Sequence, residues 1–354
     1  MASVVAPRFT MTLAGDAKRF RRLYLVPRRL HGGKAVMHNE NLFAGSPLSA
    51  ATLREIALEP GRPRPGPGEV HIVDQLIAER SMGLRSHPLW PLMRPFLYKI
   101  LHYDAAVKLA DTVASLPPGD VFEHASQLLS LDIHAVGEHN IPREGGFVVV
   151  ANHPTGIADG IAMHDMLSHW RDDIVYMANR DALRVNIRLA DALIPVEWRE
   201  SARTATKTKE TLKLTSRAIS RGAALVIFPS GRLAAWKDGG LRERPWMASA
   251  VTLAKKHGLP IVPMRLTARN SGLFYFVSRF SQELRDMTIF HELLNKKGKR
   301  FDFSIAPPIA PAELGEASEA TRRLQHFCEH TLASDPSAVF DPEGPLAPKA
   351  PNSH

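Results

Sequence analysis

The sequence predicts an α/β fold, a mixed sheet with covering helices that follows a helical N-terminal region. Short apolar runs rich in β-branched and aromatic residues recur between residues 136 and 310, and helical stretches separate several of them. The preceding residues 69–135 show the three- and four-residue spacing of helices instead. With 354 residues, 44% of them apolar, the chain is long enough for one large domain or two smaller ones.

Residues 1–68 are basic and weakly patterned. They end in a run rich in proline and glycine over 60–68, which cannot hold a helix or a central strand. We therefore expect a weakly structured N-terminal region that closes in a linker.

Residues 69–135 are expected to be helical and to offer a possible membrane contact. A stripe at helical spacing is formed by Phe96, Ile100, Tyr103, Val107 and Ala110. Such a stripe usually belongs to a core. Upstream of it, residues 87–95 are apolar but contain three prolines. The alternative is therefore a surface that lies in the lipid interface, where Trp90, Leu92 and Met93 would meet the membrane.

Residues 136–310 are expected to form the catalytic domain. The predicted strands are Phe147–Ala151, 174–177, 193–196, 223–228, 261–264, 274–277 and 301–305. The predicted helices are 160–170, 204–221 and 246–257. Residues 311–354 are expected to contain a short helix within 313–333 and then a mobile, proline-rich tail from Asp335.

The chain is basic, with 45 Lys and Arg against 36 Asp and Glu and a formal charge of +9. This excess favours acidic partners such as anionic lipid headgroups, phosphorylated substrates, an acidic carrier protein or nucleic acid, although it is also typical of an ordinary solvated surface. Nucleic acid is disfavoured, because aromatic residues make up 7% of the chain and are not interleaved with the basic ones.

Cys328 is the single cysteine, which excludes an internal disulfide framework and a cysteine-rich zinc site and fits a reducing compartment. The N-terminus lacks an apolar run of signal-peptide length, and no window approaches the roughly 20 apolar residues of a spanning helix. We therefore expect a cytoplasmic protein that is peripheral on the inner face of the cell membrane.

His153 and Asp159 are the candidate catalytic residues. They follow the apolar run Phe147–Ala151, with a turn containing proline and glycine between them, and the sequence places Asp159 at the N-cap of the next helix. Among 16 histidines, only His153 has an aspartate six positions later. A carboxylate on one imidazole nitrogen fixes the tautomer and leaves the other nitrogen to accept a proton from a hydroxyl. The alternative is a polar loop whose aspartate merely caps a helix.

Four short blocks carry a resemblance to a known family. Asn152-His153-Pro154 with Asp159-Gly160, the first block, resembles the first motif of the phospholipid and lysophospholipid acyltransferases, the glycerolipid acyltransferase superfamily. The second block, 193–199, the third block, 228–232, and the fourth block, 261–264, resemble the later motifs in the family's order. Together they span about residues 150–265.

Two features depart from the family's usual pattern. The spacing is His-x5-Asp rather than His-x4-Asp, and Ser230 stands where the third motif usually has a glutamate. With residues 269–271 and 274–275, the first block looks closer to the bacterial branch of lyso-ornithine lipid acyltransferases and haemolysin-like acyltransferases.

The resemblance implies transfer of a fatty acyl chain from acyl-carrier protein or coenzyme A to a hydroxyl of a lysolipid, either lysophosphatidic acid or a lyso-ornithine-type lipid. It implies no cofactor beyond that thioester co-substrate and no metal. His153 would be the general base and Asp159 its partner, with backbone amides of the same turn, such as those of Thr155 and Gly156, stabilising the oxyanion. The residues expected to bind substrate are Asn152, Arg199, Ser230, Gly231 and Arg232. An anionic membrane surface is the further expected partner.

Three alternatives stay open. A serine hydrolase would need a Gly-x-Ser-x-Gly elbow, which the chain lacks. A metal site would have to join His153 and Asp159 to His164 or Asp165, without a zinc-type spacing. The third is a catalytically inactive peripheral lipid-binding protein of the same fold.

Overall fold

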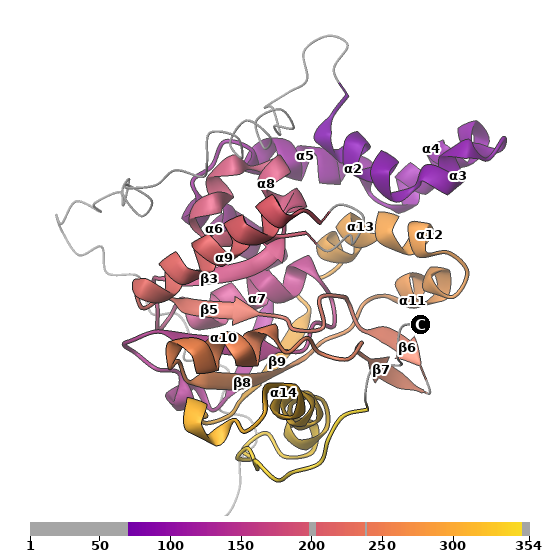
Figure 1. Ribbon diagram of the computed structural model, residues 1–354. Helices are drawn as coiled ribbons and strands as arrows, with labels where there is room; N and C mark the ends of the chain where they lie inside the picture. Colours follow the sequence, from indigo (N-terminus) through magenta and orange to yellow (C-terminus); the bar gives the residue numbers. More distant parts are fainter. Residues whose placement is uncertain (1–69, 198–202, 238, 349–354) are drawn as a thin grey trace, which may run out of the picture. The chain divides into compact units, whose positions relative to one another are not determined.

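The computed structural model describes residues 70–197, 203–237 and 239–348 (Figure 1). The predicted N-terminal region and linker therefore lie outside the described residues. Within residues 70–348, no helix of the described chain is long and apolar enough to cross a membrane.

A seven-stranded sheet is the centre of the fold, in the order β1-β9-β8-β2-β5-β3-β4. Its strands are β1 (Asp132–Val136), β2 (Phe147–Ala151), β3 (Ile174–Asn179), β4 (Leu193–Val196), β5 (Ala224–Ile227), β8 (Ile261–Thr267) and β9 (Arg300–Ile305). The strands from β8 to β4 in this order are parallel, whereas β9 pairs antiparallel with β8 and β1 pairs parallel with β9. The predicted mixed α/β fold is confirmed.

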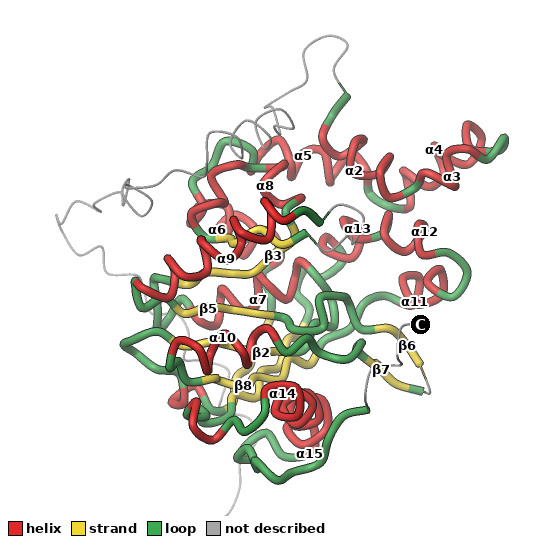
Figure 2. The backbone as a smooth tube through the Cα atoms, in the orientation of Figure 1, coloured by secondary structure: helices red, strands yellow, loops and turns green. Residues whose placement is uncertain are grey.

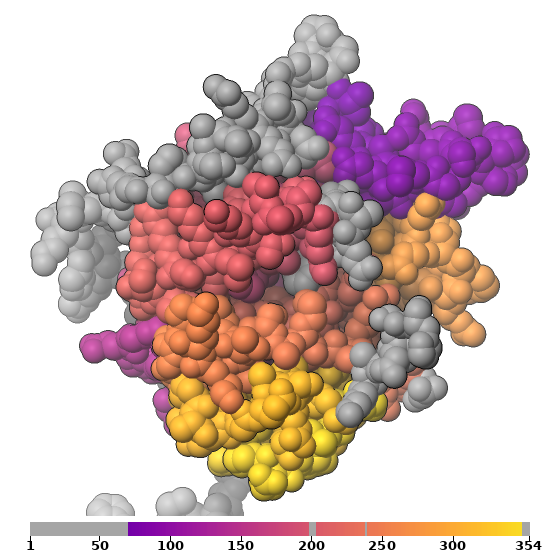
Figure 3. Space-filling view, in the orientation of Figure 1, coloured from indigo at the N-terminus to yellow at the C-terminus, as the bar shows by residue number. Residues whose placement is uncertain are grey.

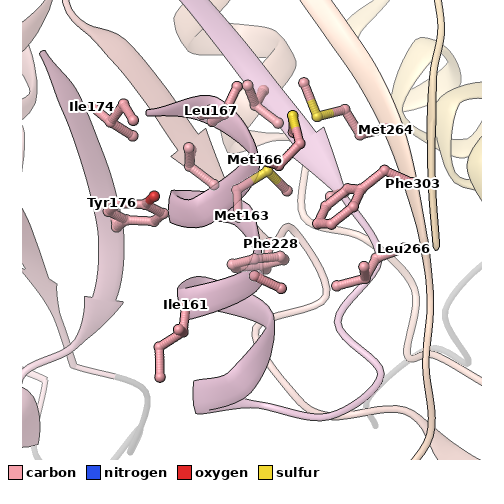
Figure 4. Close-up of a cluster of buried hydrophobic side chains, with 14 of the residues drawn as sticks. Ile161, Met163, Met166, Leu167, Ile174, Tyr176, Phe228, Met264, Leu266 and Phe303 are labelled. Atoms are coloured by element: carbon pink, nitrogen blue, oxygen red, sulfur yellow. The ribbon is translucent and has the colours of Figure 1, made fainter. Parts of the chain in front are cut away.

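The two central strands, β2 and β5, are buried along their whole length. Strands covered on both faces need apolar side chains on both, which explains their continuous apolar runs. Helix α7 (Ile157–Leu167) packs on one face, where Met163 and Met166 lie in one buried cluster with Phe303 (Figure 4). Val149 of β2 belongs to the same cluster. The alternate residues of β2 face α10 (Ser249–His257) on the other side, and α9 (Ala205–Ser220) covers β4 and β5 (Figure 1).

Helices also precede the sheet, namely α2 (Ile72–Arg80), α3 (Met82–Ser86), α4 (Trp90–Ile100), α5 (Tyr103–Val113) and α6 (Pro118–Leu129). Helices α2, α4 and α5 share a hydrophobic cluster of their own. They meet α12 (Gln282–Met287) and α13 (Ile289–Leu294) (Figure 3). The Glu283 carboxylate accepts the N–H groups of Gly83 and Leu84 at the start of α3.

The predicted stripe from Phe96 to Ala110 does not form one buried face. The chain turns between α4 and α5 at His102, whose φ is +52°. Ala110 on α5 is buried, whereas the Phe96 side chain on α4 is 67% exposed. The prediction of one continuous core face over Phe96–Ala110 is wrong, because it assumed that a single helix continues through this turn.

The predicted strand at 274–277 is also wrong, because these residues lie in helix α11 (Gly272–Ser278). The Ser271 hydroxyl accepts the N–H of Phe274 and so caps the helix. An apolar run of four residues has no periodicity that separates a strand from a buried helix.

The C-terminal part contains α14 (Ala317–His326), the π-helical segment Phe327–Thr331 and α15 (Leu332–Ser334). The segment after Asp335 is described to residue 348 and returns to α14, where Arg322 and Ala347 exchange hydrogen bonds. The mobility of the tail stays a prediction.

Candidate active site

His153 lies two residues after the carboxyl end of β2. The neighbouring parallel strands β5 and β8 end at the same edge of the sheet, so the loops after all three strands meet there (Figure 2). In open α/β sheets this edge is where ligands bind. The topology therefore brings the first and third blocks together, while the fourth block lies within β8, where Met264 pairs with Ala151 of β2.

Asp159 lies at the third position of α7, not at its N-cap as predicted; Gly156 is the N-cap. The Asp159 carboxylate is fully buried and accepts the N–H groups of Thr155 at 2.8 Å and Gly156 at 2.9 Å, as well as the Thr155 hydroxyl. Gly156 has a φ of +96°, which disfavours any residue with a side chain. The carboxylate thus folds back on the turn that carries His153.

The two candidate catalytic side chains lie together. His153 Nδ1 is 2.9 Å from Asp159 Oδ2, although the ring is not aligned for a linear hydrogen bond. Catalytic hydrogen bonds often tighten only when substrate binds. The imidazole is 21% exposed, stacks on the Phe228 ring with centroids 4.3 Å apart, and makes no hydrogen bond through Nε2 to the described part of the chain.

The third block packs against the same turn. The Ala234 N–H donates to the His153 carbonyl at 3.1 Å, and an added Cβ at Gly156 would lie 3.1 Å from Leu233. Ser230 is buried, and its hydroxyl donates to the carbonyl of Arg232. The Arg232 side chain is exposed and forms no ion pair with the residues that the structure describes.

Comparisons with known proteins agree with this geometry. Residues 132–267 match the sequence model of the acyltransferase family. The matched region contains both candidate catalytic residues, His153 and Asp159. Two curated relatives are each named lyso-glycine lipid O-acyltransferase. The one from Bacteroides thetaiotaomicron is 24% identical, and the match covers 60% of this chain and 79% of the relative. The one from Phocaeicola vulgatus is also 24% identical, and the match covers 60% of this chain and 77% of the relative. A solved structure, the 1-acyl-sn-glycerophosphate acyltransferase PlsC from Thermotoga maritima, covers 69% of this chain and 96% of its own, with 14% identity and a TM-score of 0.43.

The Asn152 side chain is bonded within the chain, and the contact with substrate that we expected of it stays a prediction. Its side-chain amide donates to the Leu266 carbonyl at 2.8 Å and accepts the Leu266 N–H at 2.7 Å. The residue is 8% exposed. It therefore ties the turn after β2 to β8.

The expected oxyanion donors are also engaged, because the N–H groups of Thr155 and Gly156 bond to Asp159. Gly231, with a φ of +60°, shapes the third-block turn. Arg199 of the second block lies outside the described residues, and the fourth block is core, since it forms buried residues of β8.

His164, which we considered as a metal ligand, stacks on Phe122 with ring centroids 4.3 Å apart. Within the described ranges, no three His, Cys, Asp or Glu side chains gather in a way that could hold a metal ion.

Glu243 was missed by sequence reasoning. Its carboxylate accepts the backbone N–H of His153 through one oxygen and the Trp246 indole N–H, at 2.7 Å, through the other. Burial raises the pKa of Glu243 to about 8, against the two hydrogen bonds, which lower it. The contact joins residues 90 positions apart, so no local spacing could have indicated it.

Proposed function

We propose that this protein is an O-acyltransferase that moves a fatty acyl chain from acyl-carrier protein or coenzyme A to a hydroxyl of a lysolipid. The observation that carries the proposal is the His153 imidazole, held between buried Asp159 and Phe228 with Nε2 unpaired among the described residues. The acyltransferase domain and the names of the two relatives support it.

In the proposed mechanism, His153 Nε2 takes the proton of the acceptor hydroxyl while the hydroxyl oxygen attacks the thioester carbonyl carbon. Asp159 stabilises the imidazolium that forms. When the tetrahedral intermediate collapses, the carbon–sulfur bond breaks and the imidazolium proton passes to the leaving thiolate. One ester and one free thiol result, and the imidazole is regenerated.

We propose a lysolipid with an amino-acid headgroup as the acceptor, with lysophosphatidic acid as the competing candidate. Both curated relatives are lyso-glycine lipid enzymes, and this chain has Ser230 at a position where the family's third motif usually has glutamate. Arg232, exposed two residues from the contact between Ala234 and His153, would bind the anionic headgroup, because a guanidinium pairs bidentately with carboxylate or phosphate.

We further propose that the protein docks peripherally on the anionic inner face of the cell membrane. Apolar side chains of α3 and α4 are exposed, among them Leu92 at 78% and Phe96 at 67%, and exposed patches of this kind mark interaction surfaces. Helix α12 contacts both α3 and α11, where Phe276 is exposed as well. Trp90, which we expected at the membrane, is instead buried against α2 and α5.

The test is acyl transfer by the purified protein, with acyl-carrier protein and coenzyme A thioesters offered in turn. Lyso-glycine lipid, lyso-ornithine lipid and lysophosphatidic acid serve as acceptors, and the His153→Ala variant is the matched control. Ester formation with an amino-acid lysolipid, lost in the variant, supports the proposal. Lipid binding without transfer to any acceptor would leave the inactive lipid-binding protein as the function.

A further inference from the structure

A cavity of about 560 Å³ lies among α2, α3, α4 and α5, outside the acyltransferase domain. Aromatic side chains, Trp90, Tyr98 and Tyr103, form much of its lining, and the guanidinium groups of Arg85 and Arg94 line it too. The volume falls within the range of small-ligand sites, about 300–1,000 Å³. Neither the acyltransferase motifs nor the proposed reaction uses this cavity.

The cavity carries an excess of positive charge. Asp74 is the acid among its described lining residues, and both its oxygens are occupied, by the Tyr98 hydroxyl at 3.3 Å and the Tyr103 hydroxyl at 2.7 Å. Neither Arg85 nor Arg94 forms an ion pair with any carboxylate in the portion of the chain that the structure describes. Two guanidinium groups therefore keep their hydrogen-bond donors available to a ligand.

Arg85 and Arg94 both influence Tyr98, which lines the same cavity. The Arg94 guanidinium carbon lies 5.6 Å from the centroid of the Tyr98 ring. Burial and the Asp74 charge raise the pKa of the Tyr98 phenol, while the charges of Arg94 and Arg85 both oppose that rise. Both arginines line the cavity together with Tyr98, so an anion bound there would lie among two positive groups.

We propose that this cavity binds the phosphate of an anionic glycerophospholipid headgroup. A planar guanidinium can donate two parallel hydrogen bonds to a phosphate. Two guanidinium groups in one cavity therefore offer directional contacts to a phosphate in addition to positive charge. The lipid source is favoured over a free phosphate because exposed Leu89 and Leu92 lie beside the cavity residue Trp90 in sequence and could meet the acyl chains of the same lipid. The inference rests on the membrane docking proposed above.

Flotation with phosphatidylcholine vesicles, with and without phosphatidylglycerol, tests the proposal on the full chain. The variant Arg85→Lys/Arg94→Lys keeps both positive charges but loses the planar guanidinium groups and their paired N–H donors. The matched control Lys99→Gln/Lys108→Gln removes two charges from exposed positions on α4 and α5 that do not line the cavity. Circular dichroism and thermal unfolding check that each variant is folded.

We expect the arginine variant to bind anionic vesicles about tenfold more weakly or worse, since it loses charge-assisted hydrogen bonds, and to stay impaired at high salt. The lysine control should lose about fivefold per charge at low salt, and the difference from wild type should disappear as salt screens it. If the arginine variant bound anionic vesicles as well as wild type, the cavity would not be a lipid headgroup site.

Titration with inorganic phosphate separates the two sources. Saturable phosphate binding by wild type, with vesicle binding unaffected by the arginine variant, would overturn the lipid assignment. Acyl transfer to a detergent-dispersed lysolipid should be unchanged in the arginine variant. A wild type without transfer activity would therefore count against the proposed function while the vesicle result still decides the cavity.

Discussion

Asp159 offers the sharpest test of the site, because it holds the turn and is proposed to orient His153. Its buried carboxylate accepts three hydrogen bonds from Thr155 and Gly156. Asp159→Ala leaves three donors without partners, and each unsatisfied buried group costs about 1–3 kcal/mol, so a loss of about 3 kcal/mol or more is expected. In Asp159→Asn the amide oxygen can keep both backbone bonds while the hydroxyl turns to accept from the amide nitrogen, and the loss should be about 1 kcal/mol.

Urea unfolding measures these free energies, and acyl transfer per folded molecule measures the catalytic effect. The asparagine variant should be folded yet lose about 10²–10⁴-fold in kcat, because the imidazolium loses its counter-charge. Asp172→Asn, an exposed position in the loop before β3, is the control for removing one negative charge. Equal stability of the alanine and asparagine variants would show that Asp159 does not hold the turn. Near-normal turnover of the asparagine variant would refute the proposed mechanism.

Four further outcomes are expected. His153→Ala should stay folded and lose about 10²–10⁴-fold in turnover, measured with saturating donor; retained turnover would contradict the proposed base. Arg232→Ala should raise the acceptor KM more than it lowers kcat, because its contact exists in ground and transition states alike. Replacing Leu92 and Phe96 by serine should weaken flotation with vesicles at low and high salt without changing the melting temperature, and unaltered flotation would move the membrane contact elsewhere. Glu243→Gln should change the pH dependence of the free energy of unfolding. Burial raises the pKa of Glu243 in the folded state to about 8 from an ordinary 4.5. The contribution of Glu243 to stability is therefore present below pH 4.5 and is lost as pH rises through 8. Urea unfolding from pH 5 to 8 should therefore show a smaller decline in the variant than in wild type.

The central strands and the paired catalytic candidates were predictable because their signals are local. Phe147–Ala151 is apolar at every position, as a strand covered on both faces must be. His153 and Asp159 are separated by one turn, so a strand end followed by a helix start already brings them close. The predicted strands at β2, β3, β4, β5, β8 and β9 are all present.

Contacts between distant residues could not be predicted in the same way. The side-chain contact of Asn152 could not be inferred from its place beside His153, because its partner Leu266 lies 114 positions away on the neighbouring strand. Trp90 and Leu92 belong to one apolar stretch, and only the packing of α4 against α2 and α5 buries the first and exposes the second. An apolar run indicates a helix that either packs in the core or contacts a membrane or a partner. Which face of the helix is buried is decided by the tertiary structure.

The unusual His-x5-Asp spacing also has a structural explanation. Asp159 lies in the first turn of α7, and its carboxylate reaches back over the helix start to within 2.9 Å of His153 Nδ1. Gly156 makes this possible, since its positive φ turns the chain sharply and its missing side chain leaves room for Leu233 of the third block. The structure thus accommodates the His-x5-Asp spacing by placing the carboxylate at the third residue of the helix, with Gly156 closing the turn before it.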